Sequence, residues 1–165
     1  MKFSQYPANE RKLPYIFNNP AELQASLGQT FGPTDWLKIE QDRIDMFADA
    51  TGDHQWIHVD PEKAKSGPFG ATIAHGFLTL SLINYFLPQL IEVRGISMGI
   101  NYGLNKIRFP AVVTAGSRIR GRGELISVEA KAGGAIESIF RITVEVEGGG
   151  KPACVAEAIS LWYPD

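Results

Sequence analysis

The chain has 165 residues, a formal net charge of −2, 44% hydrophobic residues and 21% charged residues. This composition is typical of a single globular domain with a core, and it excludes disorder as the overall state. It lacks the basic excess of a nucleic-acid binder. The nearest candidate, formed by Arg118, Arg120 and Arg122, alternates at period two and predicts one solvated face of a strand. No nucleic-acid partner is therefore expected.

Cysteine usage and hydropathy narrow the class further. Cys154 is the only cysteine, which excludes an intrachain disulfide, and its apolar neighbours predict a buried strand residue rather than a nucleophile. The first residues carry no apolar core of the signal-peptide type. The longest apolar stretch, around 77–91, is interrupted by polar residues and Pro88 and is too short to span a bilayer. We expect a cytoplasmic protein without membrane contact.

The first half of the chain predicts short helices. Residues 1–30 are expected to form an N-terminal arm with a short helix that Asn19 caps and Gly28 ends, leaving a single domain over 31–165. Residues 36–39 predict a short strand. Apolar residues then recur at helical spacing over 41–50, up to a break at Thr51-Gly52. Asp60-Pro61 predicts the cap and first turn of another short helix.

The second half predicts one buried helix and a set of long strands. Residues 75–91 are apolar on nearly every face, which is typical of a helix that is buried all round. Strand-like runs follow, with glycine-rich turns between the last three of them, near 97–109, 116–130, 135–147 and 152–163. This order predicts an α+β domain with an antiparallel sheet wrapped on the helix. Pairing across a dimer is one way to cover the edges of such a sheet.

The segment FADATGDHQWIHVDPEKAKSGPFGATIAHGFLTLS, residues 47–81, concentrates the candidate chemistry. Asp53 follows the Thr-Gly break, and His58 follows five residues later in a predicted loop. The sequence His75-Gly76 then opens the buried helix. An acid, a base and the N–H of a helix start are the parts needed for proton transfer beside a developing oxyanion. The segment therefore predicts an enzyme.

Each of these residues also has a structural interpretation. An aspartate after a glycine commonly forms a turn, and a single histidine is more often a loop or core residue than a catalyst. The structural interpretation of Gly76 is close helix packing, and the Ser81 hydroxyl can bond back to its own helix. The pairing of Asp53 with His58, with Gln55 between them to hold a neighbouring group, favours the catalytic interpretation.

Other site classes find little support in the sequence. Asp53, His58 and His75 lack the tight spacing of zinc motifs, so we expect no metal. The chain contains no G-x-S-x-G, no G-x-G-x-x-G after a strand and no Walker loop. Lys106 and Arg108 are candidates for binding the phosphates of a ligand, and solvated surface charge is their simpler interpretation.

Two runs of the sequence resemble a known family. Gly52-Asp53-x-Gln55-x-Ile57-His58 and Ala74-His75-Gly76-x-Leu78 with Ser81 resemble the MaoC-like dehydratases, or (R)-specific enoyl-CoA hydratases. DHQWIHVDP and the stretch from Asn101 to Pro110 are similar to the branch that includes nodulation-protein-N-like acyl dehydratases. The resemblance covers roughly 36–162.

The resemblance implies a fold, a reaction and roles for the residues. The fold is the hot-dog fold, in which an antiparallel sheet wraps a long central helix, here about 75–91, and it is usually dimerised. The reaction is reversible addition of water to a trans-2-enoyl thioester, giving the (R)-3-hydroxyacyl thioester without metal or redox cofactor. Asp53 and His58 would activate the water, Gly76 would supply the oxyanion N–H, and Ser81 belongs to the site in some members.

Two departures from the commoner family motif concern the loop. Gln55 stands where asparagine is usual, and its longer amide can make the same hydrogen bonds. Trp56 stands where proline is usual, and it is expected to reshape the acyl pocket. These positions bear on acyl preference more than on reaction type.

Three alternatives stay open at the level of sequence. A thioesterase with a hot-dog fold would use a carboxylate and a helix start but release free CoA. A non-catalytic acyl-thioester-binding subunit would have no need of Asp53, His58 and Gly76 together. A hydratase of the same chemistry could serve a specialised acyl group. The expected partners are an enoyl-CoA or 3-hydroxyacyl-CoA substrate and a second copy in a homodimer.

Overall fold

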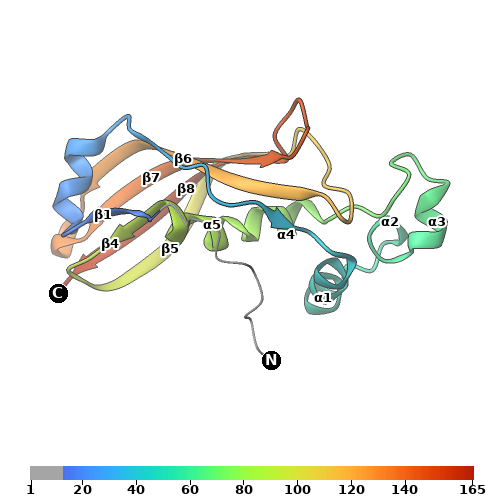
Figure 1. The fold of residues 1–165 in the computed structure, drawn as a ribbon. Coiled ribbons are helices and arrows are strands. Elements are labelled where there is room, and N and C mark those ends of the chain that lie inside the picture. Colours follow the sequence, from blue (N-terminus) through green and yellow to red (C-terminus); the bar gives the residue numbers. More distant parts are fainter. Residues whose placement is uncertain (1–12) are drawn as a thin grey trace.

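The computed structural model describes residues 13–165 (Figure 1), so the first twelve residues of the expected arm lie outside the described part. These residues form a curved six-stranded sheet in the order β2-β6-β7-β8-β5, with β3 also paired to β6. The long strands are antiparallel neighbours. The sheet consists of β2 (Thr30–Phe31), β3 (Leu37–Lys38), β5 (Ile96–Arg108), β6 (Arg118–Ala130), β7 (Ile136–Val146) and β8 (Cys154–Pro164).

The helices come before the long strands, as the sequence predicts. They are α1 (Gln41–Thr51), α2 (Trp56–Val59), α3 (Pro61–Lys65), α4 (Gly76–Ser81) and α5 (Ile83–Leu90). The first three lie beyond one end of the sheet, whereas α4 and α5 run along its concave face (Figure 1). The buried helix predicted over about 75–91 is thus two consecutive helices, with Leu82 between them at φ −69° and ψ −7°. Among residues 13–165, no helix is long and apolar enough to cross a membrane.

The break between α4 and α5 has a local cause. The Ser81 hydroxyl donates to the carbonyl of Leu78 at 2.8 Å, and the Tyr85 N–H bonds to Leu82 at the tighter three-residue spacing. Pro88 lies inside α5 and has no N–H to donate to the preceding turn. The chain nevertheless keeps its direction, so α4 and α5 together occupy the place of the predicted central helix.

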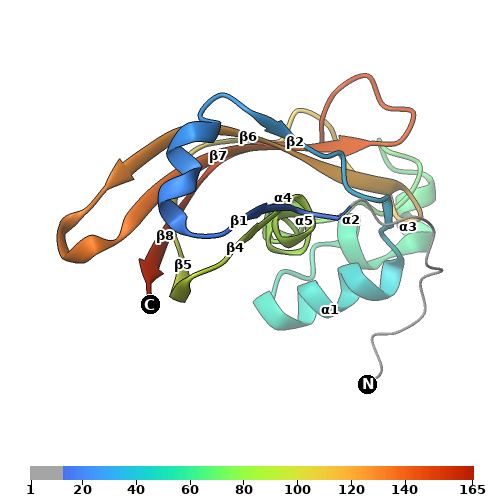
Figure 2. The same ribbon diagram turned by 60° about the vertical axis from the view of Figure 1, so that its left-hand side comes forward.

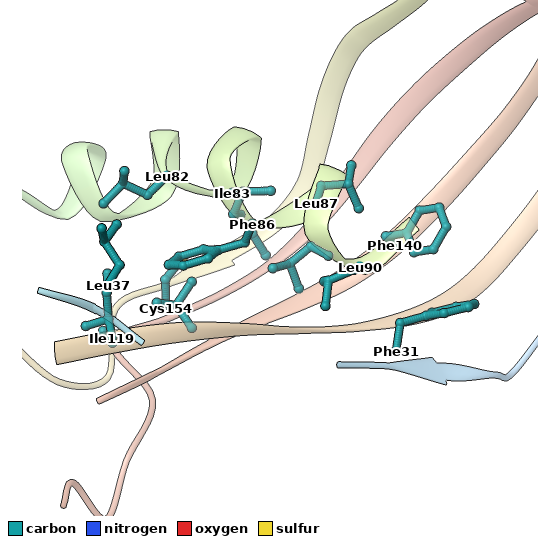
Figure 3. Packing of buried hydrophobic residues seen from close by; sticks show 14 of the residues in the cluster. Phe31, Leu37, Leu82, Ile83, Phe86, Leu87, Leu90, Ile119, Phe140 and Cys154 are labelled. Atoms are coloured by element: carbon teal, nitrogen blue, oxygen red, sulfur yellow. The ribbon is translucent and has the colours of Figure 1, made fainter. Parts of the chain in front are cut away.

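The core lies between this helix pair and the sheet. Figure 2 looks nearly along α4 and α5, and the strands β6, β7 and β8 arch over them. Side chains of α5 face inward side chains of the sheet (Figure 3). The sheet residues in this contact include Phe31, Leu37, Ile119, Phe140 and Cys154. Cys154 is fully buried in β8, which confirms the prediction from its neighbours. The predicted α+β architecture with a wrapped sheet is therefore confirmed.

A glycine in β6 allows the closest approach between sheet and helix. Gly121 points inward, and a Cβ added there would lie 2.7 Å from the Cβ of Phe86. Ordinary carbon contacts lie at about 3.5–4.0 Å, so any side chain at this position would push α5 away from the sheet. Gly121 therefore sets how closely α5 packs against β6.

The outward face of β6 carries the arginines that alternate with these inward residues. Arg120 and Arg122 both bind Glu145 on the neighbouring strand β7, at 2.6 and 2.8 Å, and Arg118 pairs with Glu147. Partial burial raises the pKa of Glu145, but the hydrogen bonds from the two arginines outweigh it and hold that pKa below its usual value. The predicted solvated strand face is confirmed.

The described part of the N-terminal segment packs on the same core. β1 (Tyr15–Phe17) pairs in parallel with β4 (Ile91–Val93), which directly follows α5. A 3-10 helix over Pro20–Ser26 follows, and Asn19 caps it by accepting a hydrogen bond from the Ala21 N–H at 3.0 Å. The short helix expected here is present, as a 3-10 rather than an α-helix.

Candidate active site

Asp53 is placed by the end of α1. Gly52 adopts the left-handed conformation at φ 77°, and its N–H bonds to the carbonyl of Ala48 at 2.8 Å, which ends the helix. Asp53 follows with an exposed side chain, and one of its carboxylate oxygens accepts the Gln55 N–H at 3.4 Å. The adjacent His54 binds Asp49 at 2.8 Å, and this hydrogen bond raises the pKa of His54. The turn thus leaves the Asp53 carboxylate at the surface.

His58 lies in the single-turn helix α2 rather than in the loop that the sequence predicts. The turn forms because the His58 N–H bonds to the carbonyl of Gln55 and the next residues continue the helical turn. The carbonyl of His58 also accepts the side-chain amide of Gln41 in α1 at 2.7 Å, which joins the two helices. The ring is buried with 6% exposure, and its Nδ1 lies 2.6 Å from the carbonyl of Ile73. Helix geometry therefore fixes His58 more firmly than a loop would.

A second histidine completes the arrangement. His75 precedes α4 and is 3% exposed, with its ring stacked on that of His58 at a centroid distance of 3.7 Å and an interplanar angle of 23°. Its Nε2 lies 3.0 Å from the backbone carbonyl of Asp53. Sequence reasoning considered His75 as a metal ligand and gave it no other role. The signal available was a histidine directly before the glycine that opens a buried helix.

Asp53, His58 and His75 form one cluster. One carboxylate oxygen of Asp53 and one ring nitrogen of each histidine all lie within 4.8 Å of one another. Two hydrogen bonds of about 2.8 Å span up to about 5.6 Å, so this gap admits a single water held between Asp53 and His58. The two imidazoles are stacked, however, and the lone pairs of stacked rings lie in nearly parallel planes. They do not converge on a common point as the ligands of a tetrahedral metal do.

Gly76 begins α4 beside this cluster. The N–H groups of the first helical turn have no partner within the helix, so the Gly76 N–H is free to meet an acceptor. The ring of Phe109, directly after β5, packs over the Gly76 Cα, and a Cβ added at Gly76 would lie 3.1 Å from that ring. Phe77 meets Phe109 edge to face at 6.2 Å and is 67% exposed. The start of α4 is therefore flanked by aromatic rings.

An apolar pocket of about 230 Å³ extends from α4 along the inner side of β5 and β8. Ser81 lines it, and α-helical rise places Ser81 about 7–8 Å from Gly76 along the helix. At its far side the amide of Asn101 donates to that of Asn84 at 2.8 Å. Both asparagines also line a second pocket of about 270 Å³ beyond this bridge. The two pockets form one groove that the amide pair divides.

The other candidate residues lie outside the cluster. Gln55 is exposed at the N-cap of α2, with its backbone N–H directed to Asp53. Lys106 and Arg108 are exposed on β5, and Arg108 donates to the neighbouring carbonyl of Ile107 at 2.7 Å. The structure thus brings together Asp53 and His58, with Gly76 next to His75 of the same cluster. Of the predicted site residues, only Ser81 lines the apolar pocket.

Comparisons with known proteins relate the chain to one family and one fold. Residues 22–147 match the family model of the MaoC-like domain. The chain is 54% identical to 3-hydroxyacyl-thioester dehydratase Z of Mycobacterium tuberculosis, over 87% of this chain and 95% of the relative. It is 43% identical to nodulation protein N of Rhizobium leguminosarum, over 86% and 89% of the two chains. The solved (R)-hydratase PhaJ1 of Pseudomonas aeruginosa superposes with a TM-score of 0.64 at 23% identity, over 84% and 83%.

The fold is the hot-dog fold of the hydratases, with α4 and α5 as the wrapped helix. The chain belongs to the MaoC-like dehydratase family, in the branch that includes nodulation protein N. It is accordingly an enzyme of the hydro-lyase class. The resemblance inferred from the Asp-His and His-Gly segments is confirmed.

Proposed function

We propose that the protein catalyses reversible hydration of trans-2-enoyl-CoA thioesters to (R)-3-hydroxyacyl thioesters. The observation that carries the proposal is the Asp53 carboxylate beside the His58 ring, at the start of the helix that opens with Gly76. The name of the 54% identical relative, a 3-hydroxyacyl-thioester dehydratase, supports the same reaction class. The R configuration is supported by the names of solved hydratases with this fold.

The hydrogen bonding of His58 defines its part in the reaction. A carbonyl oxygen only accepts, so the Nδ1 facing Ile73 carries the proton and Nε2 of the neutral ring keeps a lone pair. In the hydration direction Asp53 and His58 hold one water, and its oxygen bonds to the β-carbon as the dyad takes a proton. The same dyad returns a proton to the α-carbon. The net change is addition of one water across the double bond.

Gly76 completes the reaction by stabilising charge. As the water oxygen attacks, the π electrons move onto the thioester carbonyl oxygen, which becomes an enolate. A Gly76 N–H aimed at this oxygen stabilises it more than the neutral carbonyl, and so lowers the barrier. Ser81 and the Gln55 amide would support the site, and Lys106 and Arg108 would meet the CoA phosphates.

The apolar pocket supplies a place for the acyl chain. It begins at Leu80 and Ser81 of α4, close to where the thioester would lie, and it ends at the Asn84–Asn101 bridge. An acyl chain that fits before the bridge is the preferred substrate in this proposal. Asn84→Ala should therefore shift the kcat/KM profile toward longer chains, by about tenfold or more for the first added methylene that gains a place. An unchanged profile across C4 to C12 enoyl-CoA substrates would place the acyl chain elsewhere.

The proposal includes neither a metal nor a redox cofactor. The reaction is a proton transfer and an addition, without net oxidation, and the stacked imidazoles do not converge as metal ligands. A chelator such as EDTA is expected to leave the rate unchanged. A rate that falls on chelation and returns with one added divalent metal would reverse this part of the proposal.

The proposed partner is a second copy of the chain. β5 is an end strand of the described sheet, and it exposes apolar side chains along its length, which are Met98, Ile100, Tyr102 and Leu104. A long apolar edge strand is a template for pairing with another strand. Pairing along β5 would cover these residues and extend the sheet across a homodimer.

One assay tests the reaction against its alternatives. Crotonyl-CoA and longer enoyl-CoA substrates are mixed with protein, and the enoyl-thioester absorbance and released thiol are followed together. Hydration removes the absorbance without releasing thiol, and Asp53→Asn should slow it by about 10²–10⁴-fold. Thiol release would identify a thioesterase. Bound enoyl-CoA with neither change, for every chain length, would identify a binding subunit.

A further inference from the structure

His75 is a buried titratable side chain for which the proposed reaction has no use. Its ring lies between the rings of Phe47, at 5.0 Å, and His58, at 3.7 Å. A histidine at a buried position is usually satisfied by hydrogen bonds on both nitrogens. Here Nε2 faces the carbonyl of Asp53 at 3.0 Å, whereas Nδ1 is buried without a hydrogen-bond partner among residues 13–165. The side chain is thus anchored through one nitrogen only.

The surroundings of the two nitrogens define the protonation of the ring. The Asp53 carbonyl can only accept, so Nε2 carries a proton. A second proton on Nδ1 would have no acceptor in the described chain, and burying such a donor is unfavourable. His75 therefore donates its Nε2–H to the carbonyl of Asp53, and its Nδ1 faces no acceptor among the described residues.

We propose that His75 is a positioning residue that ties the two catalytic groups together. Its Nε2–H holds the backbone of Asp53, while its ring face supports the ring of His58. The two residues come from different elements, the turn after α1 and the short helix α2, and this one ring contacts both of them. The catalytic consequence rests on the proposed function, because a shift of the Asp53 carboxylate from the water would slow hydration.

Two substitutions separate this role from that of a core filler. His75→Gln places an amide N–H near the position of Nε2 and so keeps the donor to Asp53, but it loses the ring. His75→Phe keeps an aromatic ring between Phe47 and His58, but it has no donor. A filler role predicts that phenylalanine is the better replacement, because it preserves apolar packing. A positioning role predicts the reverse order.

Both variants are tested in the full-length protein. His75→Gln should retain kcat within about tenfold of wild type, the scale of one altered hydrogen bond. His75→Phe should lose about 10²-fold in kcat, the scale of a small misplacement of a catalytic group. KM should change little in both, because substrate contacts are untouched. A phenylalanine variant as fast as or faster than the glutamine variant would overturn the proposal.

A second measurement reads the resting protein and does not depend on activity. The chain has three histidines, so ¹⁵N labelling of histidine gives three rings, and His54→Gln identifies the exposed one. We expect the ring of His75 to carry a proton on Nε2 and the ring of His58 to carry one on Nδ1. A His75 ring whose Nε2 carries no proton would overturn the tie to Asp53. Wild-type protein that hydrates no enoyl thioester, with the expected His75 spectrum, would instead refute the proposed function and leave the tie in place.

Discussion

Gly76→Ala adds one methyl group at the place where the thioester oxygen is proposed to be stabilised. The backbone of Gly76 is not in the left-handed region, so alanine can adopt it, and alanine is the better helix former. The obstacle is the ring of Phe109, which would lie 3.1 Å from the new Cβ. Ordinary carbon contact begins at about 3.5 Å. The ring or the start of α4 must therefore move by roughly half an ångström.

A shift of this size has separate effects on stability and on rate. Overpacking of one methyl group costs about 1 kcal/mol in the free energy of unfolding, measured in urea. Displacement of the Gly76 N–H from the enolate oxygen should lower kcat by about 10²-fold, the scale for loss of one oxyanion donor. KM for crotonyl-CoA should change much less, because the interaction strengthens only in the transition state. The assay is the loss of enoyl-thioester absorbance.

The control removes the obstacle instead of the glycine. Phe109 is 41% exposed, so Phe109→Ala should fold and should retain most of the wild-type rate. The double variant Gly76→Ala with Phe109→Ala has room for the methyl group, and it should recover most of the lost kcat. Wild-type activity in Gly76→Ala alone would contradict the predicted displacement of the Gly76 N–H and would show that the ring of Phe109 moves instead of the start of α4. A double variant as slow as the single one would show that Phe109 is not the cause.

The remaining predictions concern the thiol, the outer strand face and the interface. Burial raises the pKa of Cys154 to about 11, so a thiol reagent at pH 8 should titrate no protein thiol in the native state and one thiol after unfolding. Reaction of the native protein would contradict the burial of Cys154. Glu145→Gln should cost about 1 kcal/mol at pH 7. The pKa of Glu145 in the folded protein is lowered from 4.5, so the stability difference between wild type and variant should be present above pH 4.5. It should vanish as the pH falls through the folded pKa. A difference in urea midpoints that stays constant with pH would contradict this. Tyr102→Lys on the exposed edge of β5 should raise the dimer dissociation constant at least about tenfold in sedimentation, and an unchanged value would place the interface elsewhere.

Much of the fold could be predicted because local and global signals agree. Proline and aspartate mark the start of α3, Gly52 marks the end of α1, and inward residues of β6 alternate with arginines. The central helix was predicted as one element, because its apolar composition gives no sign of the break between α4 and α5. That break accompanies the bond of the Ser81 hydroxyl to Leu78 and the tighter spacing between Tyr85 and Leu82, which are visible only in the hydrogen bonds.

The site was predicted in part for a similar reason. The spacing of Asp53 and His58 can be read directly, but the turn that orients His58 depends on Gln41, seventeen residues earlier. The stacking of His75 on His58 depends on the path of the whole segment between them. The pairing of Asn84 with Asn101 joins a helix to a strand, and no sequence pattern links the two. Contacts of this kind are tertiary and have no local signature.

Gly121 lies on the sheet behind α5, and no substrate is expected to reach it. Its missing side chain nevertheless decides how far α5 stands from β6, because its Cα faces the Cβ of Phe86 directly. Ile83, Asn84 and Leu87 of the same helix line the groove that is proposed to hold the acyl chain. An added methyl group behind the helix would therefore press these residues toward the groove and narrow it. Substrate range in this enzyme can thus change through residues at the back of the sheet, while Asp53 and His58 stay as they are.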